Sequence, residues 1–371
     1  MKKRMLMFVY NDINQDARVQ RSIDALEEFF EIKLVCVGST NEMVYNGLVI
    51  NHEAHKGMRK YFEVVLDFIR YARKEKYDVL YLHDYFSCLP GLFLWRGKTV
   101  IYDAHELMVD RPTERLDLRS RFFHFFEKRI IKKSNLIICA QEKRAEIMKE
   151  YFGLDDTPYV VPNYSELPID KEYHLSSELK KFLEKGDKQV LVYAGALTDD
   201  RRLDLIIGEM ESVSDKYKLL IIGEGNAKSA LISHAKDCAC LECFFAGGIP
   251  YRYLGYVLKK CDFGYMSYPC TSINNTYCAP NKIFEYASVG LPMICNDNPT
   301  LYEVVGKNGI GLIISQCEGA GYAQTVPEAL EHMSLHYKDY IKAIDIFRKN
   351  NSWDELKKEY LNRVIEICKM S

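Results

Sequence analysis

The sequence predicts an α/β protein made of two doubly wound domains, each a parallel sheet covered by helices. Three observations predict this class. Short apolar runs alternate with helical patterns along almost the whole chain, as in βαβ units. The length of 371 residues is large for a single hydrophobic core. A polar stretch at residues 165–188 divides the apolar runs into two series, which indicates a linker between two domains.

The first series contains six apolar runs that we expect to form strands. They are Leu6–Tyr10, Ile32–Val37, Asp78–Leu82, Thr99–Tyr102, Leu136–Cys139 and Tyr159–Val161. Helical patterns lie between them at Arg18–Phe30, Arg59–Lys74, Arg119–Lys133 and Glu142–Phe152.

The second series contains six further expected strands. They are Gln189–Tyr193, Lys218–Ile222, Glu242–Ala246, Phe263–Met266, Pro292–Cys295 and Gly311–Ile314. The last segment, Trp353–Leu361, has the apolar spacing of a packing helix. We therefore expect a first domain at 1–170, a second at 171–350, and a C-terminal helix at 351–371 that packs toward the first.

Composition excludes several classes of protein. Hydrophobic residues at 48% and charged residues at 27% are typical of a soluble globular protein. No run of 18 apolar residues is present, and a net charge of −2 gives no reason to expect nucleic acid. The basic start of Met1–Tyr10 is followed by only a short apolar run, which predicts a first strand rather than a signal peptide. We expect a cytoplasmic location.

The cysteines fit reduced core thiols, because several lie inside apolar runs, as at Cys36, Cys139 and Cys295. One cluster, Cys238–Cys243, has a C-x-x-C spacing that would suit a metal. No second pair follows at zinc-ribbon distance, so we expect buried thiols and no metal.

The most informative motif is Ala279–Ile294, which combines a helix start, a helix stop and a buried strand. Pro280 suits a helix entry and Asn281 can cap it. Lys282 and Glu285 then fall in the first turn, where free amides and the helix dipole favour an anion. This helix start could hold a diphosphate and a ribose, although many helices begin in this way for stability alone.

A second motif follows the first strand of the second series. Gly195 would let the backbone approach a ligand, and Arg201 and Arg202 open the next helix. Arginine matches phosphate oxygens with two parallel hydrogen bonds. The alternative is a solvated helix start in which these arginines pair with nearby aspartates. The turn Gly223–Gly225 is weak evidence for a nucleotide by itself.

Taken together, these pieces resemble the retaining, family-4-type (group 1) glycosyltransferases, across nearly the whole chain and most strongly from Gln189 to Gly311. The matching pieces, in order, are Tyr193–Leu197 with Arg201, Leu219–Gly225, Phe245–Leu254, Cys261–Tyr268, and Pro280–Ile294 with Glu303–Val305. The resemblance implies the GT-B fold, with two Rossmann-like domains facing a central cleft. It also implies that Arg201, Arg202 and Lys282 contact the donor diphosphate and that Glu285 binds the ribose. Ile249 or Tyr251 would line the base pocket, although Pro250 beside them equally suits a structural turn.

Two positions depart from the family pattern. The arginine that usually follows the glycine is Ala196, and the first of two glutamates eight positions apart is Cys278. Cys278 therefore leaves the contact to the donor sugar, and so the identity of that sugar, open.

The first half carries fewer motifs. Asn11, Asp16 and Arg18 lie where the first strand meets its helix; Asp16 and Arg18 are either a helix cap and a surface charge or substrate contacts. His83 and His105 follow neighbouring strands, and His83, like Asn11 and Cys278, is a possible substrate contact. The resemblance places His105 beside the donor sugar, whereas a lone histidine is more often structural.

The stretch Arg111–Lys133 holds eight cations against three acids, interleaved with phenylalanines. Such a segment can lie on an anionic bilayer, or its aromatic residues can face the core. Peripheral contact with the inner face of the cell membrane is one expectation.

We therefore expect a retaining, metal-independent hexosyltransferase that uses a nucleotide-diphosphate sugar as co-substrate and no other cofactor. Its acceptor would be a glycan or lipid-linked glycan in bacterial polysaccharide assembly. The catalytic residues would be His105, Arg201 and Lys282. The alternatives are a nucleotide-sugar epimerase of the same fold and a catalytically silent, nucleotide-sugar-binding subunit of a glycan-assembly complex.

Overall fold

The computed structural model describes residues 2–13, 16–38, 46–51, 57–169, 172, 174–184, 186–315 and 321–369. The chain forms two compact units. The first unit is Met1–Asn163 with Trp353–Ser371, and the second unit is Tyr164–Ser352. The boundary expected between Asp170 and Lys171 lies outside the described residues.

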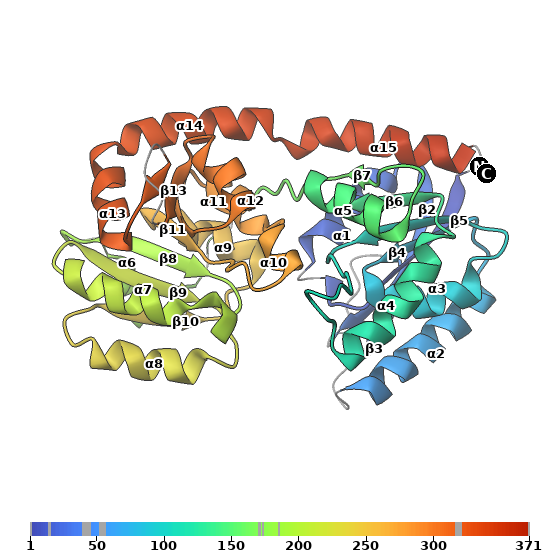
Figure 1. Cartoon of the computed structure of the whole chain (residues 1–371), viewed down its shortest axis with the longest axis horizontal. Helices are drawn as coiled ribbons and strands as arrows, with labels where there is room; N and C mark the ends of the chain where they lie inside the picture. The colour runs from blue at the N-terminus through green and yellow to red at the C-terminus, as the bar shows by residue number, and fades with distance from the viewer. Residues whose placement is uncertain are drawn as a thin grey trace. The chain divides into compact units, whose positions relative to one another are not determined.

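The first unit contains one sheet of seven strands in the order β3-β2-β1-β4-β5-β6-β7 (Figure 1). All of its strand pairs are parallel. The strands are β1 (Lys3–Val9), β2 (Phe30–Gly38), β3 (Gly47–Asn51), β4 (Val79–His83), β5 (Thr99–Ala104), β6 (Leu136–Cys139) and β7 (Tyr159–Val160). The helices are α1 (Ala17–Leu26), α2 (Met58–Lys74), α3 (Cys88–Leu94), α4 (Leu118–Ile131), α5 (Glu142–Phe152) and α15 (Trp353–Lys369), with a short 3-10 turn η2 (Tyr85–Ser87).

The second unit repeats this sheet order as β10-β9-β8-β11-β12-β13-β14, again with parallel pairs only. The strands are β8 (Gln189–Ala194), β9 (Tyr217–Ile222), β10 (Cys243–Gly247), β11 (Phe263–Met266), β12 (Met293–Asn296), β13 (Gly311–Ile314) and β14 (Tyr322–Ala323). The helices are α6 (Ser177–Leu183), α7 (Leu203–Met210), α8 (Lys228–Asp237), α9 (Tyr251–Leu258), α10 (Ile273–Thr276), α11 (Asn281–Ser288), α12 (Pro299–Leu301), α13 (Val326–Leu335) and α14 (Tyr337–Asn350). Short turns of other helix types are η3 (Asp199–Arg201), η4 (Glu211–Val213) and η5 (Tyr302–Gly306).

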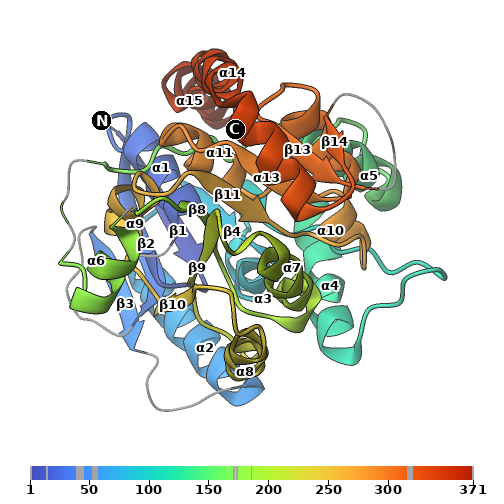
Figure 2. The same cartoon turned by 90° about the vertical axis from the view of Figure 1, so that its left-hand side faces the viewer.

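These two parallel sheets confirm the predicted fold class, and all twelve expected strands are present. Helices cover both faces of the second sheet (Figure 2). Side chains of α6, α9, α11 and α14 pack in the core on one face, and those of α7, α8 and α13 pack in the core on the other. Every residue of β4 and of β9 is buried, and both strands consist of apolar residues except for His83 and Lys218.

In each sheet the strand order reverses at one place. The reversal falls between β1 and β4 in the first unit and between β8 and β11 in the second. Ligands of doubly wound sheets bind outside the carboxyl ends of the strands at such a reversal. The fold therefore directs the search for a site to the residues that follow these strands.

The last helix, α15, belongs to the first unit although the whole second unit precedes it in the chain (Figure 1). Tyr360, Val364 and Cys368 enter the core that β1 and β4 form, and Tyr360 is 1% exposed. The Tyr360 hydroxyl is hydrogen-bonded to the hydroxyl of Tyr81 on β4 at 2.9 Å. Among the described residues, no helix is both long and apolar enough to cross a bilayer.

Candidate active site

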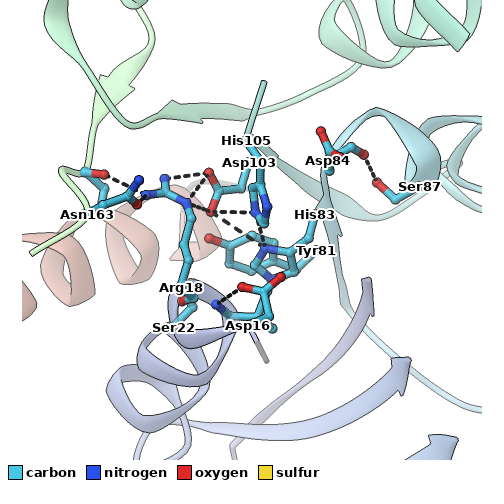
Figure 3. A network of polar contacts seen from close by, with 12 residues as sticks. Asp16, Arg18, Ser22, Tyr81, His83, Asp84, Ser87, Asp103, His105 and Asn163 are labelled. Atoms are coloured by element: carbon cyan, nitrogen blue, oxygen red, sulfur yellow. Dashed lines mark hydrogen bonds and ion pairs between the residues drawn. The ribbon is translucent and has the colours of Figure 1, made fainter. Parts of the chain in front are cut away.

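A cluster of polar side chains lies at the carboxyl ends of β4 and β5 in the first unit. It consists of Arg18, His83, Asp103 and His105, which we call the Arg18–Asp103 cluster (Figure 3). Arg18 donates to both carboxylate oxygens of Asp103, with Nη2 to Oδ1 at 2.7 Å and Nε to Oδ2 at 3.0 Å. His83 Nδ1 lies 3.6 Å from Asp103 Oδ2 and 3.4 Å from His105 Nε2. The structure thus brings three predicted residues together around an aspartate that the motif analysis did not select.

Burial and charge set the protonation states in this cluster. Burial alone would raise the pKa of Asp103, but the Arg18 charge and hydrogen bonds from His83 and Arg18 hold that pKa well below its usual range. Burial lowers the pKa of His105 against the attraction of Asp103. At pH 7 the cluster therefore contains an ion pair and a neutral His105.

The surrounding chain fixes each member. Arg18 lies in the first turn of α1, which Asp16 caps by accepting a hydrogen bond from Val19 N at 3.1 Å. Arg18 Nη1 also donates to the Val161 carbonyl at 2.8 Å and to Asn163 Oδ1 at 2.7 Å. In addition, Arg144 Nη1 donates to the His105 carbonyl oxygen at 2.8 Å.

The start of α1 contains both residues for which the sequence left two alternatives, Asp16 and Arg18. Arg18 is not the surface charge considered as one alternative, because its side chain is buried against Asp103. Asp16 is the helix cap, and Asn11 Nδ2 donates to its carboxylate at 3.3 Å. Asn11 and Asp16 therefore form a local pair at the start of α1.

Asp84, directly after β4, has an unusual backbone conformation. Its φ of 60° and ψ of 166° lie in a region that residues other than glycine rarely adopt. Its N–H donates to the Asp103 carbonyl at 2.9 Å, and its own carbonyl accepts from Ser87 N at 3.1 Å. Burial, followed by repulsion from Glu106, raises the pKa of its carboxyl well above the usual range. Strain held in this way is typical of functional sites.

The cluster also has the spacing that a metal ion would need. Ligand atoms of His83, Asp103 and His105 lie within 4.8 Å of one another. However, the Arg18 guanidinium already takes both oxygens of the carboxylate and supplies the positive charge. We therefore assign no metal to the cluster.

In the second unit, Arg201 lies at the reversal between β8 and β11. Its Nη1 donates to the Ser267 carbonyl at 2.9 Å, and its guanidinium lies 4.1 Å from the ring centre of Tyr268. Burial raises the pKa of Tyr268, the Arg201 charge opposes that rise, and Glu285 adds to it. Arg201 and Glu285 thus both lie within electrostatic reach of one tyrosine.

Helix α11 is anchored to the same end of the sheet by Tyr286. The Tyr286 hydroxyl accepts from Ala194 N at 3.1 Å and donates to the Tyr265 carbonyl at 3.2 Å, so it bridges β8 and β11. Within the first turn, Lys282 forms an ion pair with Glu285, which is 2% exposed. This pair places a cation and a carboxylate side by side at the amino end of the helix.

The start of α11 differs in detail from the prediction. The helix begins at Asn281 with Pro280 in the capping position, and no side chain caps it. Asn281 is therefore not the cap we expected, because it lies inside the first turn. An uncapped helix start leaves backbone amides for an anion.

The glycine turns after β8 and β9 touch each other. Gly223 has a φ of +143°, and a Cβ there would lie 1.8 Å from the Gly195 carbonyl oxygen. Gly195 N donates to the Ile222 carbonyl at 2.9 Å. The weak Gly223 motif therefore has a clear packing role beside the predicted site residue Gly195.

The remaining predicted residues of the second unit each have different contacts. Arg202 is exposed and pairs with Asp204 at 3.3 Å. Ile249 is half-buried against the core, and the Tyr251 hydroxyl is hydrogen-bonded to Ser165 at 2.7 Å. Cys278, expected as a possible substrate contact, is instead 2% exposed, with its Sγ directed at Asn298.

Among the described residues, Cys238, Cys240 and Cys243 do not form a group that could hold a metal ion. Cys238 is buried, Cys243 is half-buried and Cys240 is exposed. Burial raises the pKa of Cys243 to about 12, so its thiol is protonated at neutral pH. Cys238 and Cys243 fit the predicted core thiols, whereas Cys240 does not.

Sequence reasoning did not single out Asp103, Tyr268 and Tyr286 as site residues. The only available signal for Asp103 was a charged residue at the end of an otherwise apolar strand. Tyr268 and Tyr286 lie inside matching motifs but resemble ordinary core residues.

Comparison with protein families gives two matches that together cover most of the chain. Residues 22–164 match the model described as Glycosyltransferase Family 4. Residues 176–345 match the model described as Glycosyl transferases group 1. No curated protein sequence matches the chain.

Solved structures with the same fold include three that cover nearly the whole chain. Sucrose-phosphate synthase from Thermosynechococcus elongatus has 12% identity and a TM-score of 0.74, with 100% of both chains covered. Anabaena HepE in complex with UDP and glucose has 12% identity and a TM-score of 0.75, with 98% of this chain and 100% of that chain covered. WaaG, a glycosyltransferase of lipopolysaccharide biosynthesis, has 12% identity and a TM-score of 0.66, with 93% of this chain and 94% of that chain covered.

Proposed function

The chain belongs to the retaining glycosyltransferases of family 4 and group 1, and from this premise we propose that it transfers a hexose from a nucleotide-diphosphate sugar to an acceptor hydroxyl. The observation that carries the proposal is the uncapped start of α11, where Lys282 pairs with the buried Glu285. A cation and backbone amides suit a diphosphate, and a fixed carboxylate suits the hydroxyls of a ribose.

In this proposal, Arg201, Lys282 and the α11 amides stabilise the diphosphate as it leaves the sugar. Negative charge grows on the leaving oxygen during the transfer, and donors already in place lower the barrier most. The stack on Tyr268 and the bond to Ser267 hold the Arg201 guanidinium in one position before the donor arrives. The acceptor hydroxyl attacks from the face that the diphosphate leaves, and its proton passes to a diphosphate oxygen.

His105 contacts a hydroxyl of the transferred sugar. Arg144 already donates to the His105 main-chain carbonyl, whereas the imidazole is partly exposed. The imidazole is therefore the group of His105 that we assign to the sugar.

One of the HepE structures is a complex with UDP-glucose, so UDP-glucose is the first donor to test. For the acceptor we propose a glycan or lipid-linked glycan in bacterial polysaccharide assembly at the cytoplasmic face of the membrane. WaaG, of the same fold, acts in lipopolysaccharide biosynthesis.

The test is a panel of uridine, guanosine, adenosine and thymidine diphosphate sugars. We expect one donor to raise the melting temperature and to release its nucleoside diphosphate when an acceptor is added. EDTA should leave the rate unchanged, because the charge-stabilising groups of the proposal are side chains and amides. Chromatography of the released nucleotide, with and without EDTA, measures both results.

Other outcomes would replace the proposal. Donor binding without transfer to any acceptor would favour the silent binding subunit. Conversion of the donor to its epimer without an acceptor would favour the epimerase. Loss of activity in EDTA that zinc or magnesium restores would contradict metal independence.

We further propose that the first unit contacts an anionic bilayer through α2, α3 and α4, which pack side by side (Figure 1). Five large apolar side chains are exposed on and beside these helices: Phe62, Leu66, Phe93, Leu118 and Phe125. Exposed cations follow them along α4 and its end: Arg119, Arg121, Lys128, Arg129, Lys132 and Lys133. We call these residues the basic-aromatic face.

The aromatic residues of this segment are divided between the two alternatives. Phe123 is buried and packs in the core, but Phe125 is 49% exposed and Leu118 is 85% exposed. The Phe62 and Phe122 ring centres lie 6.0 Å apart, which joins α2 and α4. Apolar side chains beside cations suit the interface of an anionic bilayer.

Reversing two charges of this face should weaken binding to vesicles. Lys132→Glu with Lys133→Glu is expected to lower affinity for phosphatidylglycerol vesicles by at least about tenfold, since each surface cation contributes roughly 1 kcal/mol. Co-sedimentation at low and high salt measures this. The matched control reverses the exposed Lys338 and Lys342 of α14 in the second unit. Equal binding by both double variants, or binding that ignores lipid charge, would exclude the proposed surface.

A further inference from the structure

The Arg18–Asp103 cluster contains one buried polar atom that has no partner among the described residues. This atom is Nε2 of His83, whose side chain is fully buried. The other ring nitrogen of His83, Nδ1, faces Asp103 Oδ2 at 3.6 Å and His105 Nε2 at 3.4 Å (Figure 3). Thus Nδ1 of His83 lies beside two polar groups, whereas Nε2 of the same ring has no polar partner among the described residues.

These surroundings decide which nitrogen of His83 carries the proton. A proton on Nε2 would be a buried donor with no acceptor, and Nδ1 would present a lone pair to the Asp103 carboxylate. A proton on Nδ1 faces the Asp103 carboxylate, which is an acceptor in its charged form. The very low pKa of Asp103 keeps that carboxylate charged. His83 is therefore the Nδ1–H tautomer.

The state of His83 in turn decides the state of His105. With the proton of His83 on Nδ1, a second proton on His105 Nε2 would place two N–H groups face to face across 3.4 Å, and Asp103 Oδ2 is 3.9 Å from that nitrogen. His105 Nε2 therefore accepts, and the single proton of a neutral His105 is on its Nδ1. The ring of His83 cannot turn freely, because it stacks on Tyr81 with centres 4.4 Å apart and planes at 13°. Tyr81 is itself held by the hydroxyl of Tyr360.

We propose that Asp103 and His83 are positioning residues that make His105 present an N–H donor, at Nδ1, to its ligand. This inference rests on the proposed function of the cluster, in which the ligand is an oxygen of the transferred sugar. A donor at this nitrogen can bind a hydroxyl oxygen and an oxygen that gains negative charge, whereas a lone pair could only accept. Arg18 holds Asp103 in place, and neither Asp103 nor His83 needs to touch the sugar.

The test uses nitrogen-15 NMR of histidine side chains in the full-length protein without ligand. Two-bond proton–nitrogen spectra distinguish Nδ1–H from Nε2–H rings, and loss of one signal set in His105→Gln and of another in His83→Phe assigns the two residues. We expect both rings to be Nδ1–H in the wild type. A His105 ring protonated at Nε2 in the wild type would overturn the inference.

Two variants add a second readout. His83→Phe keeps an aromatic ring on Tyr81 but removes the donor, so His105 should change to Nε2–H or to a mixture of tautomers. Tyr81→Phe keeps the stack and removes only the hydroxyl bond to Tyr360, so the His105 tautomer should not change. If His105 stays Nδ1–H in His83→Phe, His83 does not set its state.

Kinetics then separate positioning from folding. His83→Phe should lower kcat by about ten- to a hundredfold and leave KM for the donor nearly constant, because a misplaced group affects the transition state more than nucleotide binding. An equal loss in Tyr81→Phe would indicate a purely structural effect. The NMR result does not depend on transfer activity, so failure of the proposed function and failure of this inference remain distinguishable.

Discussion

Replacing Arg201 by alanine is expected to lower kcat by about a hundredfold or more, as for other positioned donors that stabilise developing charge. Lys282→Ala should lower kcat by a factor of the same order. The physical reason is that each cation is held before the donor binds, Arg201 on Tyr268 and Lys282 on Glu285. Initial rates with saturating donor measure the effect, and melting temperatures show whether the variants fold.

The matched control is Arg348→Ala, which removes an exposed arginine of α14 in the same unit. Its kcat should stay within about twofold of the wild type, since exposed substitutions away from a site have small effects. Wild-type rates in both Arg201→Ala and Lys282→Ala would refute the assignment of these residues to the diphosphate.

Replacing Arg18 by methionine is expected to lower the free energy of unfolding of the first unit by about 3–5 kcal/mol, the cost of leaving one partner of a buried ion pair alone. Asp103 would lose three hydrogen bonds, and Asn163 would lose one. Urea unfolding followed by circular dichroism measures the loss. Arg59→Met, at an exposed pair with Glu63, should cost less than about 1 kcal/mol.

The pH dependence of this loss has a definite sign. In the wild type the folded pKa of Asp103 is lowered, so the stabilising contribution is present above the unfolded pKa of about 3.9 and is lost as pH falls toward the folded pKa. In Arg18→Met, burial without the cation raises the pKa of Asp103, so the variant gains relative stability as the carboxyl becomes protonated. The difference between the two proteins should shrink as pH falls. A difference that is constant from pH 7 to pH 4 would show that Asp103 is not the group involved.

The fold could be predicted from the sequence because parallel strands that are buried on both faces are largely apolar runs. The run Leu136–Cys139 coincides with β6 at both ends. The strands β3 and β14 were missed for a physical reason. β3 is at one edge of its sheet and β14, of two residues, is at one edge of the other, so neither needs the continuous apolar pattern of a central strand.

The candidate site could be predicted where its residues lie one helical turn apart or follow neighbouring strands. Lys282 and Glu285 lie one helical turn apart, so helix geometry alone brings them together. His83 and His105 end neighbouring parallel strands, and the rule for doubly wound sheets places such residues at one edge.

The interaction between Arg18 and Asp103 was not accessible in this way. These residues are 85 positions apart, and they meet only because β1 and β5 both adjoin β4 while α1 presents Arg18 toward the strand ends. A helix-start arginine has the same local pattern whether it is solvated or buried. Asn281 shows that prediction over a short range also has a limit. A shift of one residue in the helix start decides whether it occupies the capping position or the first turn.

The return of α15 to the first unit has a consequence for the order in which the protein folds. Residues of α15 fill part of the core beside β1 and β4, yet the ribosome must translate the entire second unit before it reaches Trp353. At roughly 5–20 residues per second, this delay is on the order of ten seconds or more. During that time the apolar side chains of β1 and β4 that pack against α15 in the folded unit lack this helix. The second unit can therefore finish folding first, although the first unit is synthesised before it.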